Sequence, residues 1–297
     1  MRPESIEEAS ALLAGAARDG RRVRIGADLH TDGLDRVLEH EAGDLTCTVE
    51  AGIRLSALQA ALGRAGQRLS LDPPDDPTIG ACLARRLSGP LSHRYGTPRD
   101  LVLGVTLVLG DGTVASAGGK VVKNVAGYDL GKLVCGSEGR LGLIARVALR
   151  LHPLPAASET LVVETDDPVG VVRELRRSHL QPSALDVLHP GRVAMLFEGR
   201  DAAVDAQLET ARALVGGEVT DTAVWDEARR RQDEALGRLR FVPGDLRNVL
   251  STLEESVVRA SAGIAYVPQR IGGVPPAAAR GIQRALRERF DPAGVLA

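Results

Sequence analysis

The sequence predicts an α+β fold made of two parts, and three observations support that class. The chain has 297 residues, 44% of them hydrophobic, the size at which one hydrophobic core usually divides into two. Some stretches have apolar residues at helical spacing, and others alternate apolar and polar residues, which is typical of strands. The two kinds of stretch are interleaved along the chain. A proline-rich exit, His152-Pro153-Leu154-Pro155, separates two series of such elements. We therefore expect one domain over 1–155 and a second over 156–297.

The first series begins with an amphipathic helix over residues 6–18, where Ser5 and Glu8 have the spacing of a capping box. Alternation and turn residues then predict strands at 21–25, 45–50, 101–109, 113–117 and 143–151, and a helix at 55–65. Gly110-Asp111-Gly112 forms the turn of a hairpin. Three prolines make 71–77 an extended loop.

The second series mixes helices and strands. We expect strands at 160–164, 184–188, 193–197, 238–242 and 263–267, and helices at 168–177, 201–214, 225–236, 246–257 and 277–290. This order indicates a largely antiparallel sheet with helices on one face.

Composition excludes several classes of partner. A net charge of −2 gives no electrostatic footprint for nucleic acid, and no apolar run approaches the roughly 20 residues of a membrane helix. The N-terminus lacks the features of a signal peptide, so we expect a cytoplasmic protein that associates with a membrane only through partners. The three cysteines have no paired spacing and the six histidines no ligand spacing, so no disulfide or metal site is expected.

Lysine is concentrated in one segment. The chain has 34 arginines but three lysines, and all three lysines lie within residues 120–132, together with Asn124, one of two asparagines. Lysine is a compact, flexible point charge, unlike the planar guanidinium. Its confinement to this segment indicates a chemical role there, although chance clustering is the alternative.

Glycine marks the stretches that leave regular structure. Thr78-Ile79-Gly80 opens a helical run directly after the proline-rich loop, and its N–H groups are suited to an anion. Ser88-Gly89 and Arg94-Tyr95-Gly96 follow, and a longer glycine-rich segment covers 118–144. The spacing of Gly136, Gly139 and Gly142 matches neither a Walker A loop nor a Rossmann fingerprint, so we expect a loop whose backbone approaches a ligand closely.

These segments resemble a known family. Residues 78–84, 88–96, 99–104 and 118–144 are similar to the FAD-binding subunits of bacterial glycolate oxidases, in the vanillyl-alcohol oxidase superfamily, also called PCMH-type FAD-binding proteins. The resemblance covers 1–155 and 285–297. It implies a two-part FAD-binding domain followed by an α+β cap domain with a largely antiparallel sheet, and a C-terminal segment that returns to the FAD-binding domain.

The resemblance also implies a set of FAD-binding residues. Thr78, Ile79 and Gly80 would lie near the pyrophosphate and flavin, and Ser88, Gly89 and Tyr95 would line the flavin. Asn124, Gly127 and Tyr128 would lie near the ring and dinucleotide, and Gly139, Gly142 and Ile144 near the ribose and adenine. Arg94, Lys120 and Lys123 are candidate partners of a carboxylate or phosphate, and no catalytic residue is assigned.

One segment departs from the family. Relatives follow the first strand with a glycine-rich pyrophosphate loop, which is deleted here near residues 26–33, where Asp28 brings a carboxylate instead. Two hypotheses therefore stay open. The chain is an FAD-dependent oxidoreductase subunit that oxidises a small 2-hydroxy acid, or it is a flavin-poor or flavin-free structural subunit of an oxidase complex. In the second case it docks a catalytic flavoprotein subunit and an iron–sulfur subunit.

Overall fold

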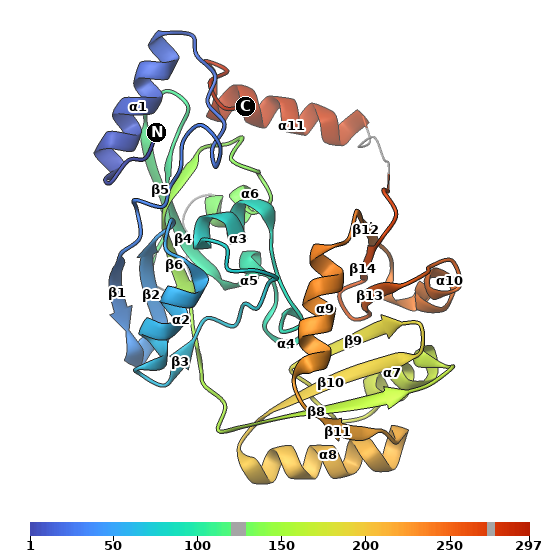
Figure 1. Ribbon diagram of the computed structural model, residues 1–297. Coiled ribbons are helices and arrows are strands. Elements are labelled where there is room, and N and C mark those ends of the chain that lie inside the picture. The colour runs from blue at the N-terminus through green and yellow to red at the C-terminus, as the bar shows by residue number, and fades with distance from the viewer. Residues whose placement is uncertain (120–128, 272–276) are drawn as a thin grey trace.

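Two large antiparallel sheets organise the chain (Figure 1). The computed structural model describes residues 1–119, 129–271 and 277–297. The first sheet has the order β1-β2-β6-β4-β5 and the second the order β11-β8-β10-β9-β13-β14-β12. A separate two-stranded sheet pairs β3 (Gln67–Arg68) with β7 (His152–Pro153).

The first sheet forms the core of the N-terminal part. Its strands are β1 (Val37–Glu41), β2 (Thr46–Glu50), β4 (Val102–Val108), β5 (Val114–Gly118) and β6 (Leu143–Arg150). The helices of this part are α1 (Ile6–Arg18), α2 (Leu55–Gly63), α3 (Ile79–Arg85), α4 (Ser92–Tyr95), α5 (Pro98–Leu101) and α6 (Leu130–Val134), with the 3₁₀ turn η1 (Ala42–Asp44). Helices α2 and α3 bury their apolar residues against β2, β4 and β6. The three cysteines are free and buried.

The C-terminus returns to the N-terminal part. The expected strand at 21–25 is reduced to isolated bridges, one of which pairs Val23 with Leu296 in parallel. The Asp291 carboxylate accepts hydrogen bonds from the N–H groups of Val295 and Leu296, which holds this end in place. Val295 and Leu296 are buried with the inner face of α1, so residues from the two ends of the chain share one apolar cluster.

The second sheet lies beyond the proline-rich exit. Its strands are β8 (Ala157–Glu164), β9 (Ala184–His189), β10 (Arg192–Gly199), β11 (Glu218–Thr220), β12 (Gly237–Arg240), β13 (Ser256–Arg259) and β14 (Ile264–Val267). The helices are α7 (Pro168–Arg177), α8 (Asp201–Val215), α9 (Ala223–Asp233), α10 (Leu246–Leu250) and α11 (Ala277–Phe290), with the turn η2 (Pro243–Asp245). None of the helices in the described ranges has the length and apolar character of a membrane span.

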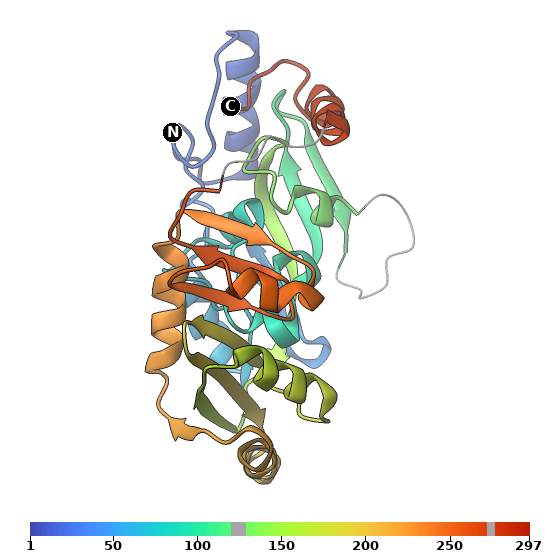
Figure 2. The same ribbon diagram turned by 90° about the vertical axis from the view of Figure 1, so that its right-hand side faces the viewer.

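Helices cover both faces of this sheet, so the expectation of helices on one face is wrong. Along β10, Val193, Met195 and Phe197 face the cluster that includes α7, α8 and α10, whereas Ala194 packs with the start of α9. Figure 2 shows α9 on one side of the sheet and α7 on the other. Helix α9 also touches the N-terminal part, because Gln232 bonds Ser88.

The expected helix at 246–257 is also wrong. The chain forms only the short helix α10 and then enters β13, which pairs with β9 and β14. The buried pair Val257 and Val258 is β-branched, and the two residues face opposite sides of the sheet. Cross-strand packing on both faces therefore outweighs the helical spacing of the leucines before it.

Candidate functional site

A cavity of about 480 Å³ opens in the N-terminal part, within the range of roughly 300–1,000 Å³ that small-molecule sites occupy. Three segments that are distant in sequence form its walls: the turn at 25–31, helix α3 and the segment 138–144. The lining residues are Ile25, Gly26, Thr31, Thr78, Gly80, Ala81, Ala84, Arg85, Leu87, Glu138, Gly139, Gly142 and Ile144. The wall is mainly aliphatic and glycine, with two charged side chains.

The cavity brings together part of the residue set expected from sequence. Thr78, Gly80, Gly139, Gly142 and Ile144 all line it. Ile79 lies directly behind the wall, because its side chain is fully buried in the core. Convergence of these separate segments on one space is what a shared ligand requires.

The start of α3 does not offer the free N–H groups that the expected anion site needs. Thr78 is the N-cap, and its Oγ1 accepts from the N–H of Ala81 at 3.2 Å. The N–H of Ile79 donates to Ile53 O at 2.9 Å and that of Gly80 to Ala51 O at 2.6 Å. The N–H groups that an anion would need therefore already donate hydrogen bonds within the same domain.

The turn over residues 24–29 is closed in the same way. The N–H groups of Ala27, Asp28 and Leu29 all point to Arg24 O, at 2.8–3.2 Å. The Asp28 carboxylate receives the Arg24 guanidinium through two bonds of 2.9 Å, and this holds the pKa of Asp28 well below its usual range. Asp28 is thus committed to Arg24, and the turn presents no cradle of backbone donors.

Two charged residues face the cavity. Arg85, at the end of α3, is exposed and makes no ion pair among the described residues. Glu138 has a left-handed backbone with φ 53° and pairs with Arg140 at 2.8 Å. Arg85 is therefore the lining cation available to a phosphate.

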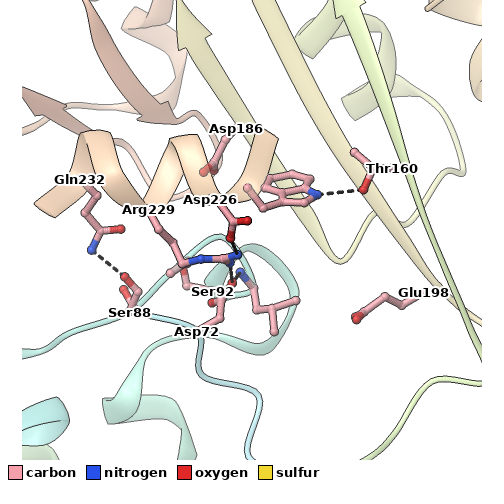
Figure 3. A network of polar contacts seen from close by, with 12 residues as sticks. Asp72, Ser88, Ser92, Thr160, Asp186, Glu198, Asp226, Arg229 and Gln232 are labelled. Carbon is pink, nitrogen blue, oxygen red and sulfur yellow. Dashed lines mark hydrogen bonds and ion pairs between the residues drawn. The ribbon is translucent and has the colours of Figure 1, made fainter. Parts of the chain in front are cut away.

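Other expected residues lie elsewhere, at the contact between the two parts of the chain. The carbonyl of Ser88 accepts from Gln232 Nε2 at 2.9 Å (Figure 3). It also accepts from Arg259 Nη1 at 3.3 Å. Gly89 packs on the backbone of Asp72 so closely that a Cβ would lie 1.8 Å from its carbonyl oxygen. Neither residue lines the 480 Å³ cavity.

Tyr95 and Arg94 belong to the same contact. Tyr95 Oη lies 3.1 Å from Arg68 Nη2 and 3.4 Å from Glu198 Oε2. Arg94 donates to the carbonyl of Gln181 at 3.0 Å and lies over the Tyr95 ring. Lys120, Lys123, Asn124, Gly127 and Tyr128 lie outside the described residues.

A polar network that the sequence did not reveal crosses this contact, and part of it is buried. Asp72 accepts from the N–H of Leu91 at 3.1 Å and lies 3.5 Å from Arg229, which also bonds Asp226 at 2.7 Å (Figure 3). Asp186 is fully buried, 3.7 Å from Arg259 Nε. Burial raises the pKa of Asp72 to about 7 and that of Asp186 to about 6, and the arginines only partly offset this.

Comparison with known proteins agrees with this architecture. Residues 1–118 match the family model described as FAD binding domain. Over 99% of its length the chain superposes on two structures of alkyldihydroxyacetonephosphate synthase, with TM-scores of 0.74 and 0.78, covering 74% and 76% of that chain at 17% identity. Residues 1–118 are thus similar to the FAD binding domain family, and the chain shares the fold of these structures, which confirms the predicted α+β, PCMH-type fold class.

The relatives found by sequence match a smaller part of the chain than these structures do. The chain is 34% identical to glycolate oxidase subunit GlcE of Escherichia coli over 201 residues, 66% of this chain and 56% of GlcE. It is 31% identical to D-lactate dehydrogenase [cytochrome] 1 of Saccharomyces cerevisiae over 166 residues, 55% of this chain and 28% of that protein. Glycolate oxidase subunit GlcD of Bacillus subtilis matches at 32% over 164 residues, 52% of this chain and 34% of GlcD. The similarity to glycolate oxidase subunits is confirmed, and the matched region spans little more than half of GlcE.

Proposed function

We propose that the chain is an FAD-dependent oxidoreductase subunit that acts on a small 2-hydroxy acid. The FAD binding domain match over residues 1–118 supports the cofactor. The names of the relatives support the substrate class, because glycolate and D-lactate are both 2-hydroxy acids. FAD, when bound, would supply the hydride acceptor.

The observation that carries the proposal is the convergence of Thr78, Gly80, Gly139, Gly142 and Ile144 on one cavity. Its aliphatic wall, with Ile25, Leu87 and Ile144, suits the adenine and ribose of a dinucleotide, as aromatic stacking residues are scarce in this chain. Arg85 is placed to meet one phosphate. In this proposal residues 1–155 hold the cofactor and residues 156–297 form the cap over it.

The phosphates fit less well than the adenosine. Two backbone segments, 26–29 and 79–81, could cradle the phosphates, but their N–H groups already donate to acceptors within the protein. One guanidinium supplies about 1.5–3 kcal/mol of charge-assisted hydrogen bonding, less than a full cradle. We therefore propose that FAD binds weakly to the isolated chain and more tightly in a complex.

This misfit favours a second candidate function. The chain would then be a flavin-poor structural subunit that docks a catalytic flavoprotein subunit and an iron–sulfur subunit. GlcE and GlcD are each named as subunits, which supports assembly into a larger oxidase.

Anaerobic reduction separates the two functions. The FAD-loaded chain is mixed with glycolate or D-lactate, alone and with its co-purifying partners, and the visible absorption of the flavin is followed. The enzyme proposal expects bleaching that requires Arg85. Bleaching that is unchanged when this chain is omitted from the partner mixture would instead support the structural subunit.

A further inference from the structure

A second cavity, of about 290 Å³, lies between the two parts of the chain. Arg85, Arg86 and Leu87, at the end of α3, form one wall. Residues from the end of α9 and the start of β12, with Tyr266 of β14, form the other. Arg85 and Leu87 also line the 480 Å³ cavity, so the two spaces adjoin at these residues.

The lining of this second cavity carries an excess of positive charge. Arg85, Arg86 and Arg238 contribute three guanidinium groups, and Asp233 contributes the one carboxylate among the lining residues. None of the three arginines forms an ion pair with a described residue, and the two undescribed segments contain no Asp or Glu. Other arginines at the same contact, such as Arg68 and Arg229, do have carboxylate partners.

The crowding of these cations has an electrostatic cost. Arg238 lies 5.9 Å from the centre of the Tyr266 ring, whose other neighbour is Arg259 at 4.9 Å. Desolvation, together with the nearby charges of Arg240, Arg86 and Arg259, lowers the pKa of Arg238. An anion between the arginines would relieve this repulsion.

Arg86 is held in place by a specific backbone arrangement. It caps α3 with φ 53° and ψ 47°, the left-handed region in which helix ends usually carry glycine. Its stem lies over Gly136, where a Cβ would come within 2.7 Å of Arg86 Cδ. Arg86 thus has a strained backbone conformation, and its side chain packs on a glycine that leaves space for it. This arrangement indicates a role for the Arg86 guanidinium.

We propose that this cavity binds a small organic anion with two negative charges, a dicarboxylate or a phosphate monoester. In the chain without FAD, three guanidinium groups and one carboxylate match a dianion better than a monoanion. The anion would lie beside the space assigned to FAD. The binding of this anion does not depend on the proposed function. Its identity as the substrate, a 2-hydroxy acid with a second anionic group, does rest on the proposed function.

Calorimetric titration of the full chain without FAD, at low ionic strength and about pH 8, tests the binding. The probes are malonate and inorganic phosphate as dianions and glycolate as the monoanion. We expect both dianions, or at least one, to bind about tenfold or more tightly than glycolate. The stronger of the two identifies the class of ligand. Equal affinity for the monoanion and both dianions would overturn the proposal.

Variants connect the binding to the cavity. Arg86→Gln and Arg238→Gln should each weaken binding of the dianion by about tenfold, because each removes a charge-assisted contact. Arg240→Gln is the matched control, since it removes the same charge from the same strand but does not line the cavity. An equal loss of dianion affinity in all three variants would contradict the proposal. So would a loss of FAD binding, rather than of dianion binding, in Arg86→Gln and Arg238→Gln. Dianion binding without any FAD binding would leave it standing and refute only the proposed function.

Discussion

Arg68 of β3 and Glu198 of β10 form a two-pronged ion pair that joins the two parts of the chain. Nη1 lies 2.7 Å from Oε1 and Nη2 lies 2.6 Å from Oε2. The side chains are 13% and 6% exposed, so the pair is shielded from water. It fixes the position of the second sheet relative to the β3–β7 pair.

Glu198→Gln should destabilise the protein by about 3–5 kcal/mol, because it leaves the Arg68 charge buried without a carboxylate. The free energy of unfolding in urea measures this effect. Glu234→Gln, which breaks the exposed Arg230–Glu234 pair, is the control and should cost less than about 1 kcal/mol. Similar losses in the two variants would show that the buried pair contributes no more than a surface pair.

The buried carboxyls should make stability depend on pH. Below about pH 4 the Asp186 carboxyl is protonated in both the folded and the unfolded chain, and its contribution to the stability of the folded state is fully present. As the pH rises through about 6, the unfolded chain has released its proton while the folded protein still holds it, so this contribution is lost. The loss is on the order of 3 kcal/mol, from a pKa raised by about two units.

Asp186→Asn isolates this contribution. Burial lowers the pKa of His152 to about 4, so that residue acts in the opposite direction, and only a comparison of variant with wild type cancels it. The stability of wild type relative to Asp186→Asn, from urea unfolding, should fall between pH 4 and 7.5. A difference that stays constant over this range would mean that the carboxyl ionises normally.

Limited proteolysis tests the predicted domain boundary. Residues 154–156 connect the β3–β7 pair to the second sheet, so mild digestion should yield fragments ending and starting near 155. Primary cleavage within 100–145, with 150–160 intact, would argue against a boundary there.

Local patterns predicted most elements but not their partners. The helix at 6–18 matches α1, and the hairpin around Gly110-Asp111-Gly112 matches β4 and β5, because capping and turn chemistry act over a few residues. Residues 246–257 were predicted incorrectly, since packing of β13 between β9 and β14 decided their structure.

The same limit applies to the site. Glycine motifs located two of the three walls of the cavity, but the satisfied donors of Ile79 and Gly80 depend on carbonyls of residues 51 and 53. The Asp72–Asp186 network joins residues more than 100 positions apart, and neither aspartate has a distinctive sequence context. Only the folded chain reveals such contacts.

Arg85→Gln should weaken FAD binding about tenfold, because Arg85 is the lining cation available to a phosphate. Fluorescence quenching of added FAD gives the dissociation constant. Arg64→Gln, an exposed arginine at the end of α2 outside the cavity, should leave it unchanged. Equal effects of the two substitutions would remove Arg85 from the cofactor site.

The flavin content of the purified single chain tests the central claim most directly. A cavity that fits the adenosine but lacks a phosphate cradle predicts a nearly colourless preparation, which takes up FAD only at high concentration or with partner subunits. The absorption spectrum after gel filtration, with and without prior incubation with FAD, measures this. A yellow protein that retains one FAD per chain through gel filtration would contradict the account.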